Sequence, residues 1–210
     1  EEDGLEAACA KKDVLKAHTV WNGAQDAGWK NTGRGTVAVV YDKALEKNIL
    51  RMEAQTVYDW FPEGQPAYAH YMNFGRMQAF LPIEREDWRG YNRITFRIRP
   101  NYAARKHVTC IAAVVNDGET KVPDIYHREG YHVINLLNGE WNTVQWEFPD
   151  LPRDCVTGIY LYAFLSGDNG ACGTQIRYDF ESICLEQIAE PERVIGWQGN
   201  LNRIFYATAG

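Results

Sequence analysis

The chain has 210 residues, enough for one large domain with a substantial hydrophobic core. Its formal net charge of −6 weighs against nucleic acid or an anionic membrane surface as a partner. No apolar run approaches the length of a transmembrane helix, so we expect no membrane insertion. None of the five cysteines has C-x-x-C spacing, which weighs against zinc, although Cys155 and Cys172 flank one predicted strand and could pair.

Residues 1–34 are expected to form a short N-terminal helix and a lead-in to the main domain. The segment LEAACAKKDVLKAH within Glu1–His18 contains good helix formers and no glycine or proline. Trp21–Thr32 contains glycines and is expected to be a loop. Thr36–Tyr41 and Asn48–Val57 then predict a hairpin, because the side chains of the second segment alternate between two faces.

An aromatic segment with two prolines, Tyr58–Tyr71, follows this hairpin. It includes Trp60, and aromatic residues on such a loop are either a platform for a ligand or a plug that pins the loop to its domain. Strands are expected over Ala67–Phe74 and Met77–Leu81, and a short turn of helix over Glu84–Arg89.

The segments that follow carry the pattern of a β-sandwich. In Tyr91–Arg99 and Trp141–Phe148, apolar and polar residues alternate with a period of two, as in strands with one buried face and one wet face. His107–Asn116 is apolar on both faces, which predicts a central strand. We therefore predict an all-β, antiparallel β-sandwich over residues 35–189. The predicted core includes Ile94, Phe96, Ile98, Val144, Trp146, Phe148, Ile159 and Leu161.

The strand predicted over Gly158–Ser166 breaks the polar-out rule. Its small aliphatic side chains suit the core, which leaves Tyr160 and Tyr162 on the opposite face. Tyrosine there can stack on a flat ligand and hydrogen-bond through its hydroxyl. Alternatively, a loop or the N-terminal segment covers these rings, since large exposed apolar patches are rare.

The sequence changes character after a closing strand predicted over Ile176–Leu185. Pro191 and the glycines and asparagines near 196–200 are typical of a linker. We expect residues 190–210 to be a linker or the start of a following domain, and the chain to be one module of a longer polypeptide.

Three segments share the packing pattern of a known family. The first has the spacing W-x-x-Y-x-x-I-x-F-x-I from Trp88 to Ile98, the second places Trp141, Val144 and Phe148 on one strand, and the third is YDFESICL at 178–185. Together they resemble the galactose-binding-like jelly-roll carbohydrate-binding modules of bacterial polysaccharide-degrading enzymes, family 11 in particular. The resemblance covers residues 35–185.

The resemblance implies a jelly roll that holds its ligand across a concave face lined by tyrosines. It also implies a structural calcium ion on the convex side, held by Glu181 with Asp179 beside it. It further implies an accessory domain of an enzyme that is extracellular or periplasmic after removal of a signal peptide. The residues expected at the ligand are Tyr160, Tyr162, Tyr131 or His132, Arg51, Asn116 and Trp60.

Three classes of function are compatible with this picture: a non-catalytic carbohydrate-binding module, a structural accessory domain that packs on a glycoside hydrolase domain of the same polypeptide, and a jelly-roll lyase or hydrolase. A retaining hydrolase needs two carboxylates about 5–5.5 Å apart. The sequence has no E-x-D-x-x-E, G-x-S-x-G or H-E-x-x-H motif. We therefore expect the chain itself not to be an enzyme, and we expect carbohydrate as its partner. Exposure of Tyr160, Tyr162 and Trp60 in one groove would favour the module over the structural domain.

Overall fold

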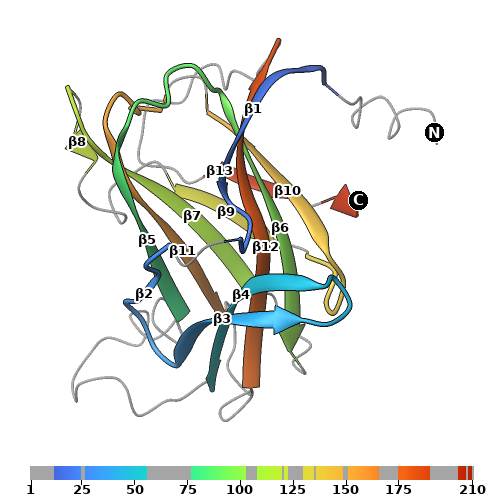
Figure 1. Cartoon of the computed structure of the whole chain (residues 1–210). Helices are drawn as coiled ribbons and strands as arrows, with labels where there is room; N and C mark the ends of the chain where they lie inside the picture. Colours follow the sequence, from blue (N-terminus) through green and yellow to red (C-terminus); the bar gives the residue numbers. More distant parts are fainter. Residues whose placement is uncertain are drawn as a thin grey trace.

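The computed structural model describes residues 12–24, 27–55, 77–102, 108–119, 121–122, 130–134, 136–148, 151–165, 175–189, 203–206 and 208–209. Over these ranges the chain forms two seven-stranded sheets and no helix. The described part of the chain accordingly has no helix able to cross a membrane. The two sheets pack face to face around one core, so the all-β sandwich is confirmed (Figure 1).

Sheet A is built around a long strand near the C-terminus. In spatial order it contains β14 (Thr208–Ala209), β10 (Asn142–Glu147), β6 (Arg93–Tyr102), β12 (Gln175–Ile188), β4 (Lys47–Gln55) and β3 (Thr36–Asp42), with β1 (Val14–Trp21) also paired to β12. All of these pairs are antiparallel. β3 and β4 form the hairpin predicted from their alternation.

Sheet B is built around two central strands, β7 and β11. In spatial order it contains β13 (Arg203–Tyr206), β9 (Gly130–Ile134), β7 (Val108–Asp117), β11 (Val156–Leu165), β5 (Met77–Glu86) and β2 (Lys30–Asn31), with β8 (Lys121–Val122) also paired to β7. Only β13 and β9 among these described strands run parallel. β7 is therefore the central strand that its apolar sequence predicted.

The core lies between the sheets and contains all eight residues predicted for it. None of the eight is more than 3% exposed. Trp146 and Phe148 also contact each other edge to face, with ring centroids 5.5 Å apart. Period-two alternation therefore identified the buried face of these strands correctly.

The helix predicted over Glu1–His18 is wrong for its last residues. Val14–Trp21 is strand β1, which pairs with the C-terminal half of β12. The backbone of these residues hydrogen-bonds to β12, and this tertiary contact overrides their helical propensity. The helical turn expected over Glu84–Arg89 is also wrong at its start, because β5 continues through Glu86.

Some predictions concern residues that the structure does not describe. Residues 1–11 and 56–76 are not described, so the helix start, the aromatic segment and the strand expected over 67–74 stay predictions. Residues 203–206 pair with β9 and residues 208–209 with β10, and the linker or following domain expected over residues 190–210 stays a prediction. Cys155 is a free thiol, and Cys172 lies outside the described residues.

Candidate ligand-binding face

The outer face of sheet B carries the aromatic row predicted from β11. Ile159, Leu161 and Ala163 point into the core, and their alternation places Tyr160 and Tyr162 on the opposite face of the sheet. The two tyrosine rings are stacked, with centroids 6.1 Å apart and an angle of 26° between their planes. The expected division of this strand into an aliphatic face and an aromatic face is confirmed.

A third ring from the neighbouring strand extends this row. Phe80 on β5 lies opposite Tyr160, and their ring centroids are 4.6 Å apart at 42°. A Cβ atom at Gly158 would overlap the Phe80 ring, so the ring can lie over β11 because residue 158 has no side chain. We call the two rings the Phe80–Tyr160 platform.

The rings of this row differ in exposure. Phe80 and Tyr160 are half-buried, whereas Tyr162 is only 4% exposed. Tyr162 therefore supports Tyr160 from the side and does not offer its own ring to solvent. Lys30, opposite Phe80 on β2, is exposed, so a cationic donor lies at the rim of the platform.

Two residues expected beside the tyrosines lie elsewhere. Arg51 is on β4 of sheet A, where its guanidinium pairs with Asp179. Asn116 is 1% exposed, and its amide donates to Asp154 and accepts from the backbone N–H of Cys155. Asn116 therefore ties the end of β7 to the segment before β11. Neither side chain is placed to contact a ligand on the platform.

The register of β9 distinguishes between the two remaining candidates. His132 pairs with Ile111, which pairs in turn with Tyr162, whereas Tyr131 pairs with Ala112. Position 132 is thus in line with the aromatic row, and position 131 is in line with the core residue Ala112. Trp60 lies outside the described residues.

The outer face of sheet A is a network of ion pairs. Asp179 is fully buried and accepts hydrogen bonds from Arg51 Nε at 2.8 Å and from Arg99 Nη2 at 2.8 Å. Arg99 also donates to Asp42 at 2.6 Å. The Arg99 hydrogen bond lowers the pKa of Asp42, and the Asp179 hydrogen bond raises the pKa of Arg51. Asp42 and Arg51 are therefore held in their charged forms.

The two carboxylates expected to hold calcium both face cations. Besides the arginines at Asp179, Glu181 accepts from Arg97 Nε at 3.1 Å and lies 3.5 Å from Lys47 Nζ. Calcium needs six to eight oxygen ligands, and no group of three or more His, Cys, Asp or Glu side chains with that capacity occurs among the described residues. As they stand, Asp179 and Glu181 do not fit a calcium site.

Sequence reasoning missed Phe80 and Gly158 as parts of the platform. Phe80 stands in the apolar run of β5, and its face depends on the register with β11. A usable signal was present, because Gln78, Phe80 and Pro82 alternate with the core residues of β5, which places Phe80 on the outer face. The role of Gly158 required the structure, since nothing in its own neighbourhood indicates a ring above it.

Comparisons with known proteins identify the fold. No family model matches the sequence, and no curated protein matches it by sequence. Among solved structures, the family 11 carbohydrate-binding module of Clostridium thermocellum in complex with a beta-1,3-1,4-mixed-linked tetrasaccharide matches at a TM-score of 0.52, with 12% identity over 85% of this chain and 99% of that chain.

Two further structures agree with it. The family 11 module of a cellulosomal cellulase of Clostridium thermocellum matches at 0.51, with 15% identity over 84% of this chain and 97% of that chain. A family 28 module, described as specific for non-crystalline cellulose, matches at 0.50, with 12% identity over 79% of this chain and 93% of that chain. The chain therefore has the jelly-roll β-sandwich fold of the family 11 and family 28 carbohydrate-binding modules.

Proposed function

We propose that the chain is a non-catalytic carbohydrate-binding module whose ligand lies across the Phe80–Tyr160 platform. The observation that carries the proposal is a pair of half-buried rings, 4.6 Å apart, on the outer face of a sheet. A pyranose ring has an apolar C–H face that such rings can cover, and its hydroxyls can bond to polar groups at the rim. Lys30 and the Tyr160 hydroxyl are polar groups of this kind.

A neutral β-glucan is the ligand class that the platform fits best. The side chains of Phe80 and Tyr160 are uncharged, and a flat run of sugar units can lie along them across β5 and β11. Two of the similar structures bind such ligands by their descriptions, a mixed-linked tetrasaccharide and non-crystalline cellulose. An open face desolvates little of its ligand, so we expect a dissociation constant of roughly 10 µM to 1 mM.

Affinity electrophoresis in gels with mixed-linkage β-glucan, together with binding to non-crystalline cellulose, tests the proposal. Tyr160→Ala should weaken binding by about 1–3 kcal/mol, because an aromatic anchor carries much of the energy of a small interface. Tyr41→Ala is the matched control, since Tyr41 is an exposed tyrosine on β3 of the other sheet and should leave binding unchanged. Equal retention of the parent and Tyr160→Ala would contradict this site.

The proposal also covers the setting of the module. We infer a carbohydrate-degrading parent enzyme with its own catalytic domain, acting outside the cytoplasm, and no hydrolysis by this chain. Incubation with the same glucans should release no reducing ends beyond a buffer control. Reducing ends that increase with protein concentration would contradict a non-catalytic role.

A structural accessory domain is the second candidate, and one observation favours it. Tyr162, at one end of the row, is only 4% exposed, so its ring serves packing and not ligand contact. If neither glucan nor a broader glycan array retains the protein, the aromatic row is packing for a neighbouring domain and the module proposal fails.

A further inference from the structure

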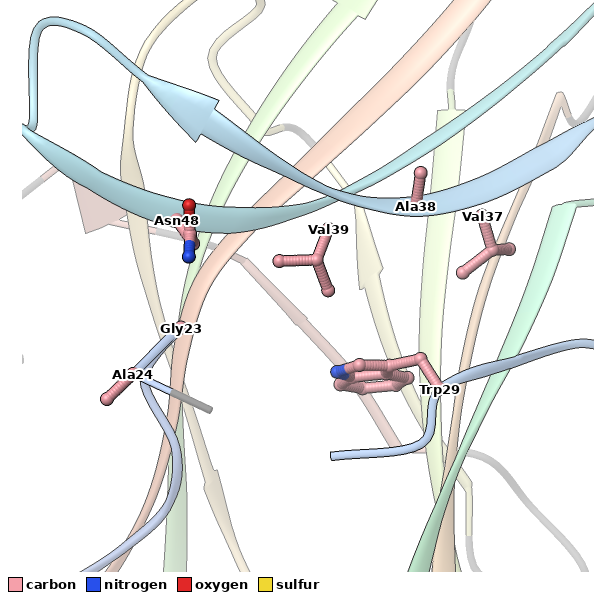
Figure 2. Close-up of a pocket in the computed structure, with 7 residues that line it drawn as sticks. All are labelled: Gly23, Ala24, Trp29, Val37, Ala38, Val39 and Asn48. Atoms are coloured by element: carbon pink, nitrogen blue, oxygen red, sulfur yellow. The ribbon is translucent and has the colours of Figure 1, made fainter. Parts of the chain in front are cut away.

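A separate hollow lies at the side of the sandwich, where the edge strand β3 passes the chain that leads into β2. Its volume is about 330 Å³, at the lower end of the range of about 300–1,000 Å³ for small-molecule sites. Its walls come from sheet A and from the segment between β1 and β2, and it shares no lining residue with the platform. The lining residues are Gly23, Ala24, Trp29, Val37, Ala38, Val39 and Asn48 (Figure 2).

Trp29 forms one wall of this pocket and is held rigidly. Its indole packs edge to face on the buried ring of Trp21, with centroids 5.6 Å apart at 86°, and contacts the edge of the core. Its Nε1 atom is buried and has no hydrogen-bond acceptor among the described residues. Figure 2 shows the nitrogen end of the indole directed toward Gly23 and Ala24. A buried donor without an acceptor costs about 1–3 kcal/mol, so a ligand oxygen here would be favoured.

The remaining walls combine apolar surface with one amide. Val37 and Val39 lie on one face of β3, and Val39 is 37% exposed, which is high for a valine in a strand. Asn48 is exposed and brings an amide that can both donate and accept. None of the described residues that line the pocket is charged, so their chemistry suits a neutral ligand with an apolar face and several hydroxyls.

One side of the pocket is closed by backbone. Gly23 has a φ of 82°, and a Cβ atom there would overlap the carbonyl oxygen of Asn48. The turn at Gly23 therefore lies directly against β4 and closes the pocket on that side.

We propose that this pocket is a second binding site, which takes one pyranose unit of a neutral saccharide. The sugar's C–H face lies on Trp29 and Val39, one hydroxyl oxygen accepts from Trp29 Nε1, and Asn48 bonds to a second hydroxyl. The inference shares the ligand class of the proposed function, although it uses none of the same residues.

NMR of the tryptophan indole N–H groups tests the inference on the whole chain. The Trp29 signal is assigned by its loss in Trp29→Phe. The probes are the methyl glycosides of glucose, galactose, mannose and xylose, followed by the mixed-linked tetrasaccharide. We expect at least one probe to shift the Trp29 signal saturably. The same probe should bind Trp29→Phe about two- to tenfold more weakly, read from the Val39 methyl signals, because one hydrogen bond is lost.

Val39→Trp and Tyr41→Trp are the matched variants. Both place an indole at an exposed position of β3, but only Val39 lines the pocket. Val39→Trp should abolish the shift, and Tyr41→Trp should preserve it. A Trp29 signal that no probe moves, or a shift that survives in Val39→Trp, overturns the second site.

Tyr160→Ala separates the two sites. It should lose retention by β-glucan and keep the Trp29 shift. If β-glucan binds the parent and no probe reaches Trp29, the second site fails while the proposed function stands. If the Trp29 shift occurs and β-glucan does not bind, the platform fails and the pocket is the carbohydrate site.

Discussion

Replacement of Asp179 by asparagine is the sharpest test of how sheet A is held together. The carboxylate is fully buried and accepts from Arg51 at 2.8 Å and from Arg99 at 2.8 Å. Asparagine keeps the size of the side chain, but it removes the charge and turns an N–H group toward a guanidinium. Losing one partner of a buried ion pair costs about 3–5 kcal/mol.

Two features of the structure reduce that figure. The side chains of Arg51 and Arg99 are 26% and 22% exposed, so water can solvate part of each guanidinium. Arg99 also keeps Asp42 at 2.6 Å. We therefore expect Asp179→Asn to lower the free energy of unfolding by about 2–3 kcal/mol.

Urea denaturation followed by circular dichroism measures this change. With a slope m of about 1–3 kcal/mol/M, the midpoint should fall by about 0.7–3 M while m stays constant. Glu53→Gln is the matched control, because the Arg177–Glu53 pair is 3.8 Å long and about one-third exposed on both sides, and such pairs contribute less than about 1 kcal/mol. A loss below about 0.5 kcal/mol in Asp179→Asn, no larger than in Glu53→Gln, would refute the argument.

Three further predictions concern acid, the platform and calcium. Because Arg99 lowers the pKa of Asp42 below its ordinary value of 3.8, Asp42 stabilises the fold above that pH and loses this effect as the pH falls through the lowered pKa. The loss of stability in Asp42→Asn should therefore shrink in urea titrations below pH 3.8, and a constant difference down to pH 2 would contradict it. Gly158→Ala should push the Phe80 ring off β11 and reduce retention by β-glucan in affinity gels, so unchanged retention would argue against the platform. Because Asp179 and Glu181 already face cations, EDTA should leave the melting temperature unchanged, and a fall on chelation would restore the calcium prediction.

Local alternation was enough to predict the strands that make up most of the core. Ile94, Phe96 and Ile98 on β6 and Val144 and Trp146 on β10 follow a period of two that only a half-buried strand satisfies. The same rule identified the aromatic face of β11, because tyrosines there break the expected polar pattern.

What the sequence could not reveal depends on partners that are distant along the chain. Val14–His18 ends a segment of good helix formers, yet these residues form the start of strand β1 because they pair with β12. Arg51 was expected to contact the sugar, but it is the counter-ion of the buried carboxylate of Asp179. The two residues are 128 positions apart in the sequence, so local patterns could not reveal this pair. Phe80 and Gly158 show the same limit within the candidate site. The Phe80 ring lies over β11 only because the register of β5 and β11 brings it to a residue without a side chain.

The central position of β12 has a consequence for how the protein reaches its native state. β12 is near the end of the described chain, yet it pairs with β1, β4 and β6, which precede it by long stretches of sequence. During synthesis, the middle of sheet A cannot form until β12 has left the ribosome. β4 can pair with β3 and β6 with β10 before then, but each keeps one edge unpaired until β12 arrives. Folds dominated by such non-local pairing fold slowly, in milliseconds to seconds. We therefore expect chaperones that shield unpaired strands to raise the yield of this protein more than a lower growth temperature does.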